Sequence, residues 1–516
     1  MKSFYLFLCL SLYAITSGQV LGPSWVSYLP GTTGNPNLMG TLSTVDSSGY
    51  SYVCGNTGTF SYYNVAQSNL TLKKFNSLLQ NEYAVNLLGD LHVYALVSDG
   101  NSLYIALNYI TQLDYETLHL SDTSGEHPVL LKLDSAGHYV WHLPLSGTNV
   151  FRFRALTLDI NNSIYIGYDN YFNSYIKKLD TNGNTLFTIT QNNVKMISNI
   201  SVDPQGNIAV AGGCSQSIPN FNGTSASNSL SYSTYIAYYN ASQQLQWVHF
   251  FEDITCSDPD VAIDPSGNVY FTSTLYDNFP LLGQPTEGPV AGLDFFLIKL
   301  NPQGNLVWYR EVPGAGQFKL AKSKSVAVSW GQNYPAVIYV AGTTRNSVQW
   351  LPDFATNPGN QDDILLLAYD LNGNIIHHTI GGSSTGNDQL DGLTINSNSS
   401  FATISGITLG TGSMHGMPLN PSTTNYTPYI IRLDQVFLNQ PEFTTTAWSV
   451  SPNPAHETIT LRTQDYIGKG TLTNLLGQKM RDFDIVSPET VLQVNELPKG
   501  IYIITVGTTS KRISIN

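Results

Sequence analysis

The histidine pair His377-His378 is the most conspicuous grouping of possible metal ligands in this sequence. The two residues are adjacent in a stretch that alternates like a β-strand, so their side chains point to opposite faces and do not readily ligate one metal together. No serine-hydrolase elbow, HExxH zinc motif or phosphate-binding Walker loop is present. The sequence therefore predicts no catalytic residue, no metal site and no cofactor, and we interpret the two histidines as packing and surface residues.

Acidic residues gather at one place that could hold a cation. Asp253, Asp258 and Asp260 flank Cys256 in a segment that is expected to be a loop. The alternative is a solvated acidic loop, which we favour. Turns such as Asp-Pro-Ser-Gly-Asn at 264–268 invite a calcium interpretation, but they lack the further carboxylates and the terminal Glu of a calcium loop. Hairpin geometry is sufficient to explain them.

Three cysteines lie beyond the N-terminal apolar segment: Cys54, Cys214 and Cys256. Three is too few for a disulfide scaffold, and at least one has to stay unpaired or pair between chains. Cys214 follows a predicted strand over 207–213, and Cys256 precedes one that begins near Asp260. A disulfide between Cys214 and Cys256 is therefore a candidate, with three buried thiols as the alternative. Cys54 is predicted to stay free, buried in a strand.

The elements that carry these residues follow a recurring pattern of short alternating strands and tight turns. The clearest copy pairs Val261–Phe271 with Phe295–Trp308, and each half is a strand, an Asx-x-x-Gly turn and a second strand. In such a turn Asp or Asn bonds its own backbone, and Gly takes the left-handed position of a three-residue hairpin loop. Two hairpins give four strands, which is one propeller blade, and the period of roughly 45 to 65 residues predicts about seven copies. A weaker copy of the first turn falls at Trp330-Gly331.

Large side chains recur at one fixed position of the fourth predicted strand. Packing between neighbouring blades needs a large side chain at one phase of that strand, so we interpret these residues as core and not as a ligand platform. The residues are Tyr83, Trp141, Phe187, Trp247, Trp308 and His377.

The seventh copy lacks a fourth strand, because Tyr429–Asp434 supplies its third and no aromatic strand follows. Trp25–Gly31, at the other end of the chain, matches Trp308–Gly314 in spacing and in its final Pro-Gly. We predict that this N-terminal strand completes the last blade and closes the ring, which removes open sheet edges. The predicted fold class is all-β: a seven-bladed β-propeller over 19–437 closed by an N-terminal strand, followed by a small C-terminal β-sandwich.

These copies resemble the β-propeller repeat family whose consensus runs Asp-x-x-Gly-Asn-x-Tyr-Val-x-Gly and then Lys-Leu-Asp-x-x-Gly-x-x-x-Trp. The resemblance covers residues 40–437 and is strongest over 198–382. The family has no common enzymatic activity, so the resemblance implies a fold and not a function.

The N-terminus is typical of a cleavable signal peptide over residues 1–18. A short basic segment precedes the apolar run Phe4–Ile15, which is too short to span a bilayer, and small residues follow at 16–18. No later run is long and apolar enough for a transmembrane helix in the mature chain. The net charge of −13, with no basic stripe, argues against nucleic acid or an anionic membrane as a partner.

The propeller pattern stops after residue 437, and residues 438–449 are predicted to be a linker. Residues 450–516 then carry a Pro-Asn-Pro opening, a central Leu-Gly-Gln turn, a Leu-x-x-Gly-Ile-Tyr strand and a basic end. In this order, and at the terminus, these features resemble the type A C-terminal sorting domain of type IX secretion. The resemblance implies a partner, the outer-membrane translocon, and delivery through the periplasm and outer membrane to the cell surface or the medium. The motif residues are Pro452, Asn453, Pro454, Gly477, Gly500 and Tyr502.

We expect an exported, non-enzymatic surface or secreted binding protein whose ligand is an extracellular protein or glycan. Loops 276–280 and 218–222 combine aromatic and amide residues that could stack on sugars, but we favour the interpretation as plain surface loops, which are common. One alternative is an extracellular hydrolase or lyase with catalytic residues on propeller loops, and another is a structural adhesin or matrix component. Carboxylates or histidines converging on the central axis would favour an enzyme, whereas a flat face lined by aromatic and amide residues would favour binding.

Overall fold

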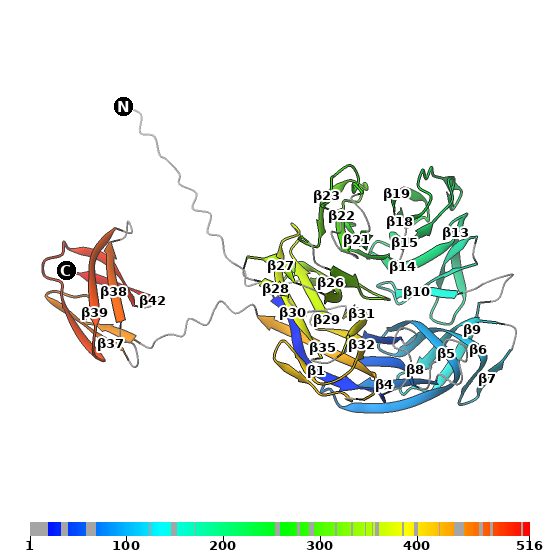
Figure 1. Ribbon diagram of the computed structural model, residues 1–516, viewed down its shortest axis with the longest axis horizontal. Helices are drawn as coiled ribbons and strands as arrows, with labels where there is room; N and C mark the ends of the chain where they lie inside the picture. Colours follow the sequence, from blue (N-terminus) through cyan, green and yellow to red (C-terminus); the bar gives the residue numbers. More distant parts are fainter. Residues whose placement is uncertain are drawn as a thin grey trace. The chain divides into compact units, whose positions relative to one another are not determined.

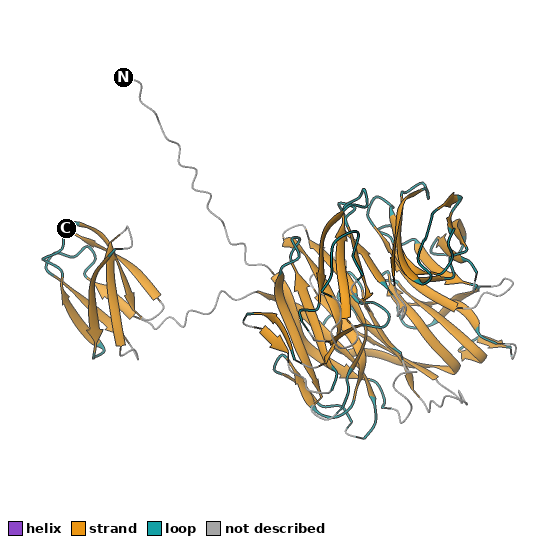
Figure 2. Ribbon diagram, turned by 45° about the horizontal axis from the view of Figure 1, so that its top comes forward, coloured by secondary structure: helices purple, strands orange, loops and turns teal. Residues whose placement is uncertain are grey.

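A computed structural model shows the regular structure of the described residues to be β-strand throughout (Figure 2). The all-β prediction is therefore confirmed. The chain divides into two compact units, one spanning Gly18–Val436 and one containing Phe437–Asn516. The predicted signal peptide and residues 438–447 of the predicted linker lie outside the described residues. The structure describes residues 19–31, 40–57, 69–122, 125–145, 152–170, 172–252, 259–275, 279–287, 294–314, 317–331, 334–345, 347–352, 354–356, 361–383, 386–396, 401–422, 424–437, 448–463, 468–474, 478–506 and 509–516.

The larger unit is a β-propeller-like series of antiparallel sheets that follow one another in chain order (Figure 1). The first sheet contains β2 (Thr41–Val45), β3 (Ser51–Thr57), β4 (Asn69–Phe75), β5 (Asn81–Ser98), β6 (Ser102–Tyr115), β8 (His127–Asp134) and β9 (Tyr139–Pro144), with β7 (Leu118–Ser121) beside β6. The next contains β10 (Arg152–Leu158), β11 (Ile164–Asp169), β12 (Ser174–Leu179) and β13 (Thr185–Asn192), extended by β16 (Asn220–Phe221) and β17 (Thr224–Ser225).

Four further groups complete the larger unit. Two are regular four-stranded sheets: β14 (Met196–Val202), β15 (Ile208–Cys214), β18 (Ser233–Tyr239) and β19 (Leu245–Glu252), then β20 (Asp260–Ile263), β21 (Val269–Leu275), β22 (Asp294–Leu300) and β23 (Leu306–Glu311). The next holds β24 (Gln317–Leu320), β25 (Val326–Gly331), β26 (Tyr334–Arg345), β29 (Asp363–Tyr369) and β30 (Ile375–Ser383), extended by β33 (Gly412–Met414) and β34 (Met417–Leu419), with β27 (Val348–Leu351) paired to β28 (Phe354–Thr356). The last is β31 (Gln389–Ile395), β32 (Phe401–Thr408), β35 (Thr427–Phe437) and β1 (Gln19–Tyr28).

Strand β5 joins two four-stranded groups into the long first sheet. Its first half pairs with β4 and its second half with β6, and the register shifts between Gly89 and Leu91. Gly89 has φ +143°, and a Cβ there would lie 2.1 Å from the carbonyl oxygen of Gln112, so only glycine fits the bend. β5 is thus the outer strand of one group and the inner strand of the next.

The first strands of successive groups lie side by side in the order β2, β5, β10, β14, β20, β25 and β31, and β31 lies against β2. Buried carboxylates join neighbours: Asp260 Oδ2 accepts hydrogen bonds from the backbone N–H groups of Ser325 and Val326 at 2.6 and 2.8 Å. Asp391 Oδ2 accepts one from Thr41 N at 2.9 Å, across 350 residues of sequence. These bonds satisfy strand-end donors that have no ladder partner.

Adjacent groups are also joined at their outer parts, where side chains of one group donate to turn carbonyls of the next. The indole N–H of Trp247 donates to Pro302 O at 3.0 Å, and that of Trp308 to Leu371 O at 2.9 Å. Lys299 Nζ also donates to Leu371 O, at 3.0 Å. The side chains of Trp247 and Trp308 therefore lie between sheets, packed on the next turn.

The N-terminal strand β1 lies at the edge of the last group, beside β35. It begins before the predicted Trp25–Gly31 segment and places the buried Leu21 in the core around β32 and β35. The Trp25 ring lies 4.7 Å from the ring of Phe75 on β4, and Lys73 Nζ donates to Tyr28 O at 2.8 Å. β1 thus contacts both the last group and the first.

The smaller unit consists of two sheets that share one apolar core, to which Trp448, Ile459, Leu472 and Ile504 contribute. β36, the first described strand of the unit, begins at Trp448 and so includes the last two residues of the predicted linker. One sheet contains β36 (Trp448–Ser451), β37 (Thr458–Thr463) and β40 (Glu489–Gln493), and the other contains β39 (Lys479–Ile485), β38 (Gly468–Asn474), β41 (Gly500–Val506) and β42 (Thr509–Ile515).

Gly304→Ala tests the contact between a turn and the aromatic ring of the preceding sheet. Gly304 has φ +79°, and a Cβ there would approach the Trp247 ring to 2.8 Å. We expect the left-handed backbone to cost about 1–2 kcal/mol and overpacking about 1–3 kcal/mol more, measured by urea unfolding of the mature protein. Gly206→Ala is the matched control, because its φ is +86° but its Cβ would meet only Ala241 at 3.5 Å. Equal losses in the two variants would contradict the packing role of Trp247.

Candidate functional site

A cavity of about 640 Å³ lies between the first strands of the larger unit. Every first strand contributes to its wall: β2, β5, β10, β14, β20, β25 and β31. Apolar residues such as Leu96, Leu156, Val202, Ala262 and Ile395 make up much of the lining. Because inner strands of all groups enclose it, the cavity lies on the axis about which the groups are arranged.

One end of this axial cavity is closed by the segment between β24 and β25. Ser323 Oγ donates to Tyr94 O on β5 at 3.2 Å, and Asn199 Nδ2 on β14 donates to Ser323 O at 3.3 Å. Ser323 N donates to Asp391 O on β31 at 2.7 Å. Backbone and side chain of one serine therefore contact three other groups, which closes this end.

Two lysines flank Ser323 and face buried carboxylates at the closed end. Lys324 Nζ lies 3.6 Å from Asp260 Oδ1, and Lys322 Nζ lies 4.0 Å from Asp391 Oδ1. Burial raises the pKa of Asp391, and the nearby Lys322 opposes that rise. These charges hold the closing segment to neighbouring groups, so they have a structural role at the axis.

Carboxylates from four turns converge at the other end of the axial cavity: Asp46, Asp99, Asp159 and Asp203. Each Oδ1 accepts two backbone N–H bonds from its own turn, and each Oδ2 accepts a tyrosine hydroxyl, a lysine ammonium or an asparagine amide. The carboxylates are therefore used in folding the turns. Carboxylates that converge on the axis are expected of an enzyme, but the oxygens of these four already accept bonds from protein groups.

Apolar side chains are exposed at this same end. Trp330 is 36% exposed and Ile160 is 72% exposed, and both line the cavity. Trp330 is the last residue but one of β25, which pairs with β26, so the hairpin that the sequence predicted around Trp330-Gly331 is present. An indole at the mouth of an apolar cavity offers a flat surface on which a ligand can stack.

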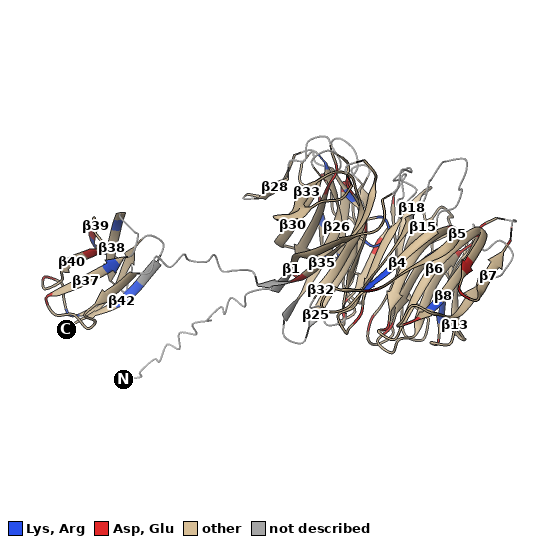
Figure 3. Ribbon diagram, turned by 90° about the horizontal axis from the view of Figure 1, so that it is seen from below, with Lys and Arg blue, Asp and Glu red and all other residues tan. Residues whose placement is uncertain are grey.

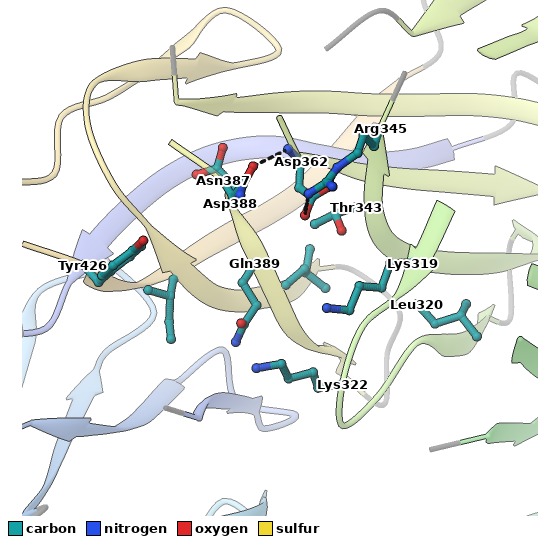
Figure 4. Close-up of a pocket in the computed structure, with 12 residues that line it drawn as sticks. Lys319, Leu320, Lys322, Thr343, Arg345, Asp362, Asn387, Asp388, Gln389 and Tyr426 are labelled. Carbon is teal, nitrogen blue, oxygen red and sulfur yellow. Dashed lines mark hydrogen bonds and ion pairs between the residues drawn. The ribbon is translucent and has the colours of Figure 1, made fainter. Parts of the chain in front are cut away.

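A second cavity, of about 470 Å³, lies among β24, β26, β31 and β32 (Figure 4). Arg345 makes a bidentate ion pair with Asp362, from Nε to Oδ1 at 2.6 Å and from Nη2 to Oδ2 at 2.8 Å. Lys319 and Lys322 direct their ammonium groups into the same space, beside Gln389. Charged residues of both signs are scattered over the ribbon of the larger unit (Figure 3), and this lining holds three cations with two carboxylates, Asp362 and Asp388.

Asp388 lies in the lining of this second cavity and is only 3% exposed. Its Oδ2 accepts a hydrogen bond from Ser383 N at 2.7 Å, while its Oδ1 has no hydrogen-bond partner in the described part of the chain. Burial raises the pKa of Asp388 to about 7, and the neighbouring carboxyl of Asp363 adds to the rise.

The predicted cysteine pair is only half described. Cys214 ends β15, is buried, and directs its thiol to Gln216 O at 3.6 Å. Cys256 and the acidic residues Asp253 and Asp258 lie outside the described residues, so the disulfide stays a prediction. Cys54 is fully buried on β3, and burial raises the pKa of its thiol to about 12.

The adjacent histidines lie on the outer strand β30. The ring of His378 stacks on the ring of Phe354, with 3.3 Å between the ring centroids. The ring centroids of His377 and His415 are 5.9 Å apart. Burial lowers the pKa of His377 to about 4. Within the described residues, no group of three or more His, Cys, Asp or Glu side chains could hold a metal ion.

The predicted sorting-motif residues have structural contacts in the smaller unit. Asn453 Nδ2 donates to Arg512 O at 3.0 Å, and its Oδ1 accepts from Ser514 N at 2.8 Å. Tyr502 is buried on β41, and its hydroxyl donates to Pro498 O at 2.7 Å. Pro452 and Pro454 flank Asn453, and Gly500 opens β41. Gly477 lies outside the described residues.

No sequence motif marks the lining of either cavity. Ser323 and the lysines on either side of it belong to no recognisable motif, and their contacts join segments more than 60 residues apart. The one available signal was Lys-x-x-Lys at 319–322, in a chain with only 23 lysines and arginines.

In the part of the chain that the structure describes, no helix has the length and apolar character to cross a membrane.

Comparison with solved structures finds distant likenesses. The structure of the Dos1 propeller has a TM-score of 0.38 and 11% identity, over 80% of this chain and 95% of that one. A virginiamycin B lyase from Staphylococcus aureus, with quinupristin, has a TM-score of 0.39 and 10% identity, over 79% of this chain and 99% of that one. PorZ, an essential surface component of the type IX secretion system of Porphyromonas gingivalis, has a TM-score of 0.25 and 10% identity, over 92% and 73%. These values are too low to carry an argument about function.

Comparison with sequences is informative only for the smaller unit. No curated protein matches the chain. Residues 449–515 match the family model described as a secretion system C-terminal sorting domain. The match covers the two sheets of the smaller unit from β36 to β42. The smaller unit is therefore a type IX secretion sorting domain, and it directs this chain through the outer membrane to the cell surface or the extracellular space.

Proposed function

We propose that the mature chain is a non-enzymatic surface or secreted binding protein whose protein or glycan ligand enters the axial cavity. The observation that carries this proposal is the form of that cavity, which is closed at one end by Ser323 and has Trp330 exposed at the other. Apolar walls with an aromatic residue at the mouth are typical of binding sites. The four turn carboxylates at the mouth already accept bonds within their own turns, which supports binding over catalysis by those groups.

The proposed frame of this site is a ring of seven blades in which β1 is the outer strand of the last. Support comes from the order of the first strands, with β31 beside β2, and from the place of β1 beside β35. A closed ring holds the seven first strands at fixed distances from the axis and leaves no open sheet edge.

The proposed maturation follows from the two ends of the chain. Residues 1–18 act as a signal peptide, residues 19–437 form the propeller, 438–449 link it, and 450–516 are read by the translocon. Pro452, Asn453, Pro454, Gly477, Gly500 and Tyr502 are the proposed sorting-motif residues. The bonds from Asn453 to the β42 backbone support a role for the Pro-Asn-Pro opening in holding the last strand in place.

Trp330→Ala tests the axial cavity. A glycan and protein-partner screen of the mature protein identifies the ligand, whose affinity is then compared between variants. We expect Trp330→Ala to weaken binding several-fold, since an aromatic stack is worth about 0.5–1.5 kcal/mol. Phe172→Ala is the matched control, because Phe172 is 70% exposed and does not line the cavity. Unchanged affinity in Trp330→Ala, or turnover of the ligand, would refute the proposal.

Removal of β1 tests closure of the ring. A mature chain that starts at Thr32 lacks Leu21 and Trp25 and exposes the edge of β35. We expect it to lose cooperative unfolding or to aggregate, as followed by thermal denaturation with a β-sheet signal. A chain that ends at residue 437 is the control, because the sorting domain is a separate compact unit. If the Thr32 variant melts like the mature protein, closure by β1 is wrong.

A reporter fusion tests the sorting assignment at the level of its motif. Residues 446–516 are joined to a periplasmic reporter in a host with type IX secretion, and reporter activity is measured outside the cells. We expect export, and a large loss of it with Asn453→Ala, because this substitution removes both bonds from residue 453 to the β42 backbone. A reporter that stays periplasmic would refute the assignment of this segment, while undiminished export of Asn453→Ala would exclude only the motif role.

A further inference from the structure

The second cavity gathers positive charge in an acidic chain. Its lining includes three cations, Lys319, Lys322 and Arg345, against two carboxylates, Asp362 and Asp388, although the whole chain has a net charge of −13. It lies among β24, β26, β31 and β32, outside the lining of the axial cavity. Its volume of about 470 Å³ is within the usual size of a small-molecule pocket, about 300–1,000 Å³.

Asp391 lies behind the lining of this pocket and interacts with both of its ammonium groups. Lys319 is exposed, and none of the ion pairs within the described residues includes it. Lys322 Nζ is 4.0 Å from Asp391 Oδ1, at the outer limit of an ion pair. Figure 4 shows both side chains directed into the same space, so their positive charges repel each other. A bound anion would relieve this repulsion.

The hydrogen-bonding groups around the cations fit a ligand that both donates and accepts. Asn387 Oδ1 accepts from Asp362 N at 3.1 Å, which leaves the Nδ2 hydrogens as donors. Gln389 Nε2 donates to Asp391 Oδ1 at 2.6 Å, which leaves Oε1 as an acceptor. The ion pair with Asp362 uses Nε and Nη2 of Arg345 and leaves Nη1 outside it.

A buried carboxyl adds an acceptor, and apolar side chains complete the wall. Asp388 is 3% exposed, and its Oδ1 has no hydrogen-bond partner among the described residues. Leu320, Leu390 and Ile407 also line the pocket and can contact C–H groups. Hydroxyls, C–H groups and a negative charge occur together in acidic sugars.

We propose that this pocket binds an acidic saccharide through its carboxylate, with a hexuronate unit as the simplest ligand. The carboxylate lies between Lys319 and Lys322, within reach of Arg345. The sugar hydroxyls bond with the free donor and acceptor atoms of Asn387 and Gln389. The inference goes beyond the axial cavity, because the two sites use different side chains for ligands of different polarity.

The test compares galacturonic acid with galactose, which differ at C6 by a carboxylate in place of a hydroxymethyl group. Binding to the full mature protein is measured by calorimetry at low and high salt. We expect galacturonic acid to bind, galactose to bind at least tenfold more weakly, and salt to weaken the binding of the acid. We expect Lys319→Met to raise the Kd of galacturonic acid at least tenfold. Lys195→Met is the matched control, because Lys195 is also exposed and lies outside the pocket.

Each other outcome overturns the inference. Equal binding of the acid and the neutral sugar, or no binding of either, removes the role of the cations. Unchanged affinity in Lys319→Met places the ligand elsewhere. Competition by propionate as strong as that by galacturonic acid assigns the pocket to carboxylates in general and not to saccharides. Trp330→Ala separates the two sites, since it should leave the Kd of galacturonic acid unchanged even if the axial cavity binds nothing.

Discussion

The contact between a side chain of one sheet and a turn carbonyl of the next is the constraint on which the larger unit depends. Trp247 and Trp308 donate to carbonyls whose positions are set by Asx bonds and by a left-handed glycine. Because the turn is rigid, the bond fixes the distance between two sheets at their outer parts. Asp260 and Asp391 do the same at the inner strands. Sheets that are held at both ends leave a space of defined width at the axis.

That space has two chemically different neighbours. The segment around Ser323 crosses the axis and binds to β5, β14 and β31, so one end of the cavity is filled with backbone and polar side chains. The same segment presents Lys322 to the second pocket. A single connection between β24 and β25 therefore shapes both candidate sites, and its conformation links their geometry.

The sequence was sufficient for the all-β class and the sorting domain, because both rest on local patterns. Asx-x-x-Gly turns such as that at Asp264 announce hairpins through bonds within five residues, and the structure has those bonds. The candidate sites were not predictable in the same way. Ser323 meets Tyr94 across 229 residues, and nothing in either local sequence records that contact. The hairpin at Trp330-Gly331 was predicted, but its local sequence does not record that Trp330 lines a cavity formed with the first strands of the other groups.

The continuous strand β5 has a consequence for the modularity of the chain. At most junctions one group ends with its own outer strand and the next group begins with a separate inner strand. A copy can therefore be gained or lost by duplication or deletion between them. β5 belongs to two groups at once, with Gly89 at the bend. Any insertion or deletion of an odd number of residues within it would reverse the facing of side chains in one group relative to the other. The first two groups therefore share a strand, and neither can be lost without disrupting the other.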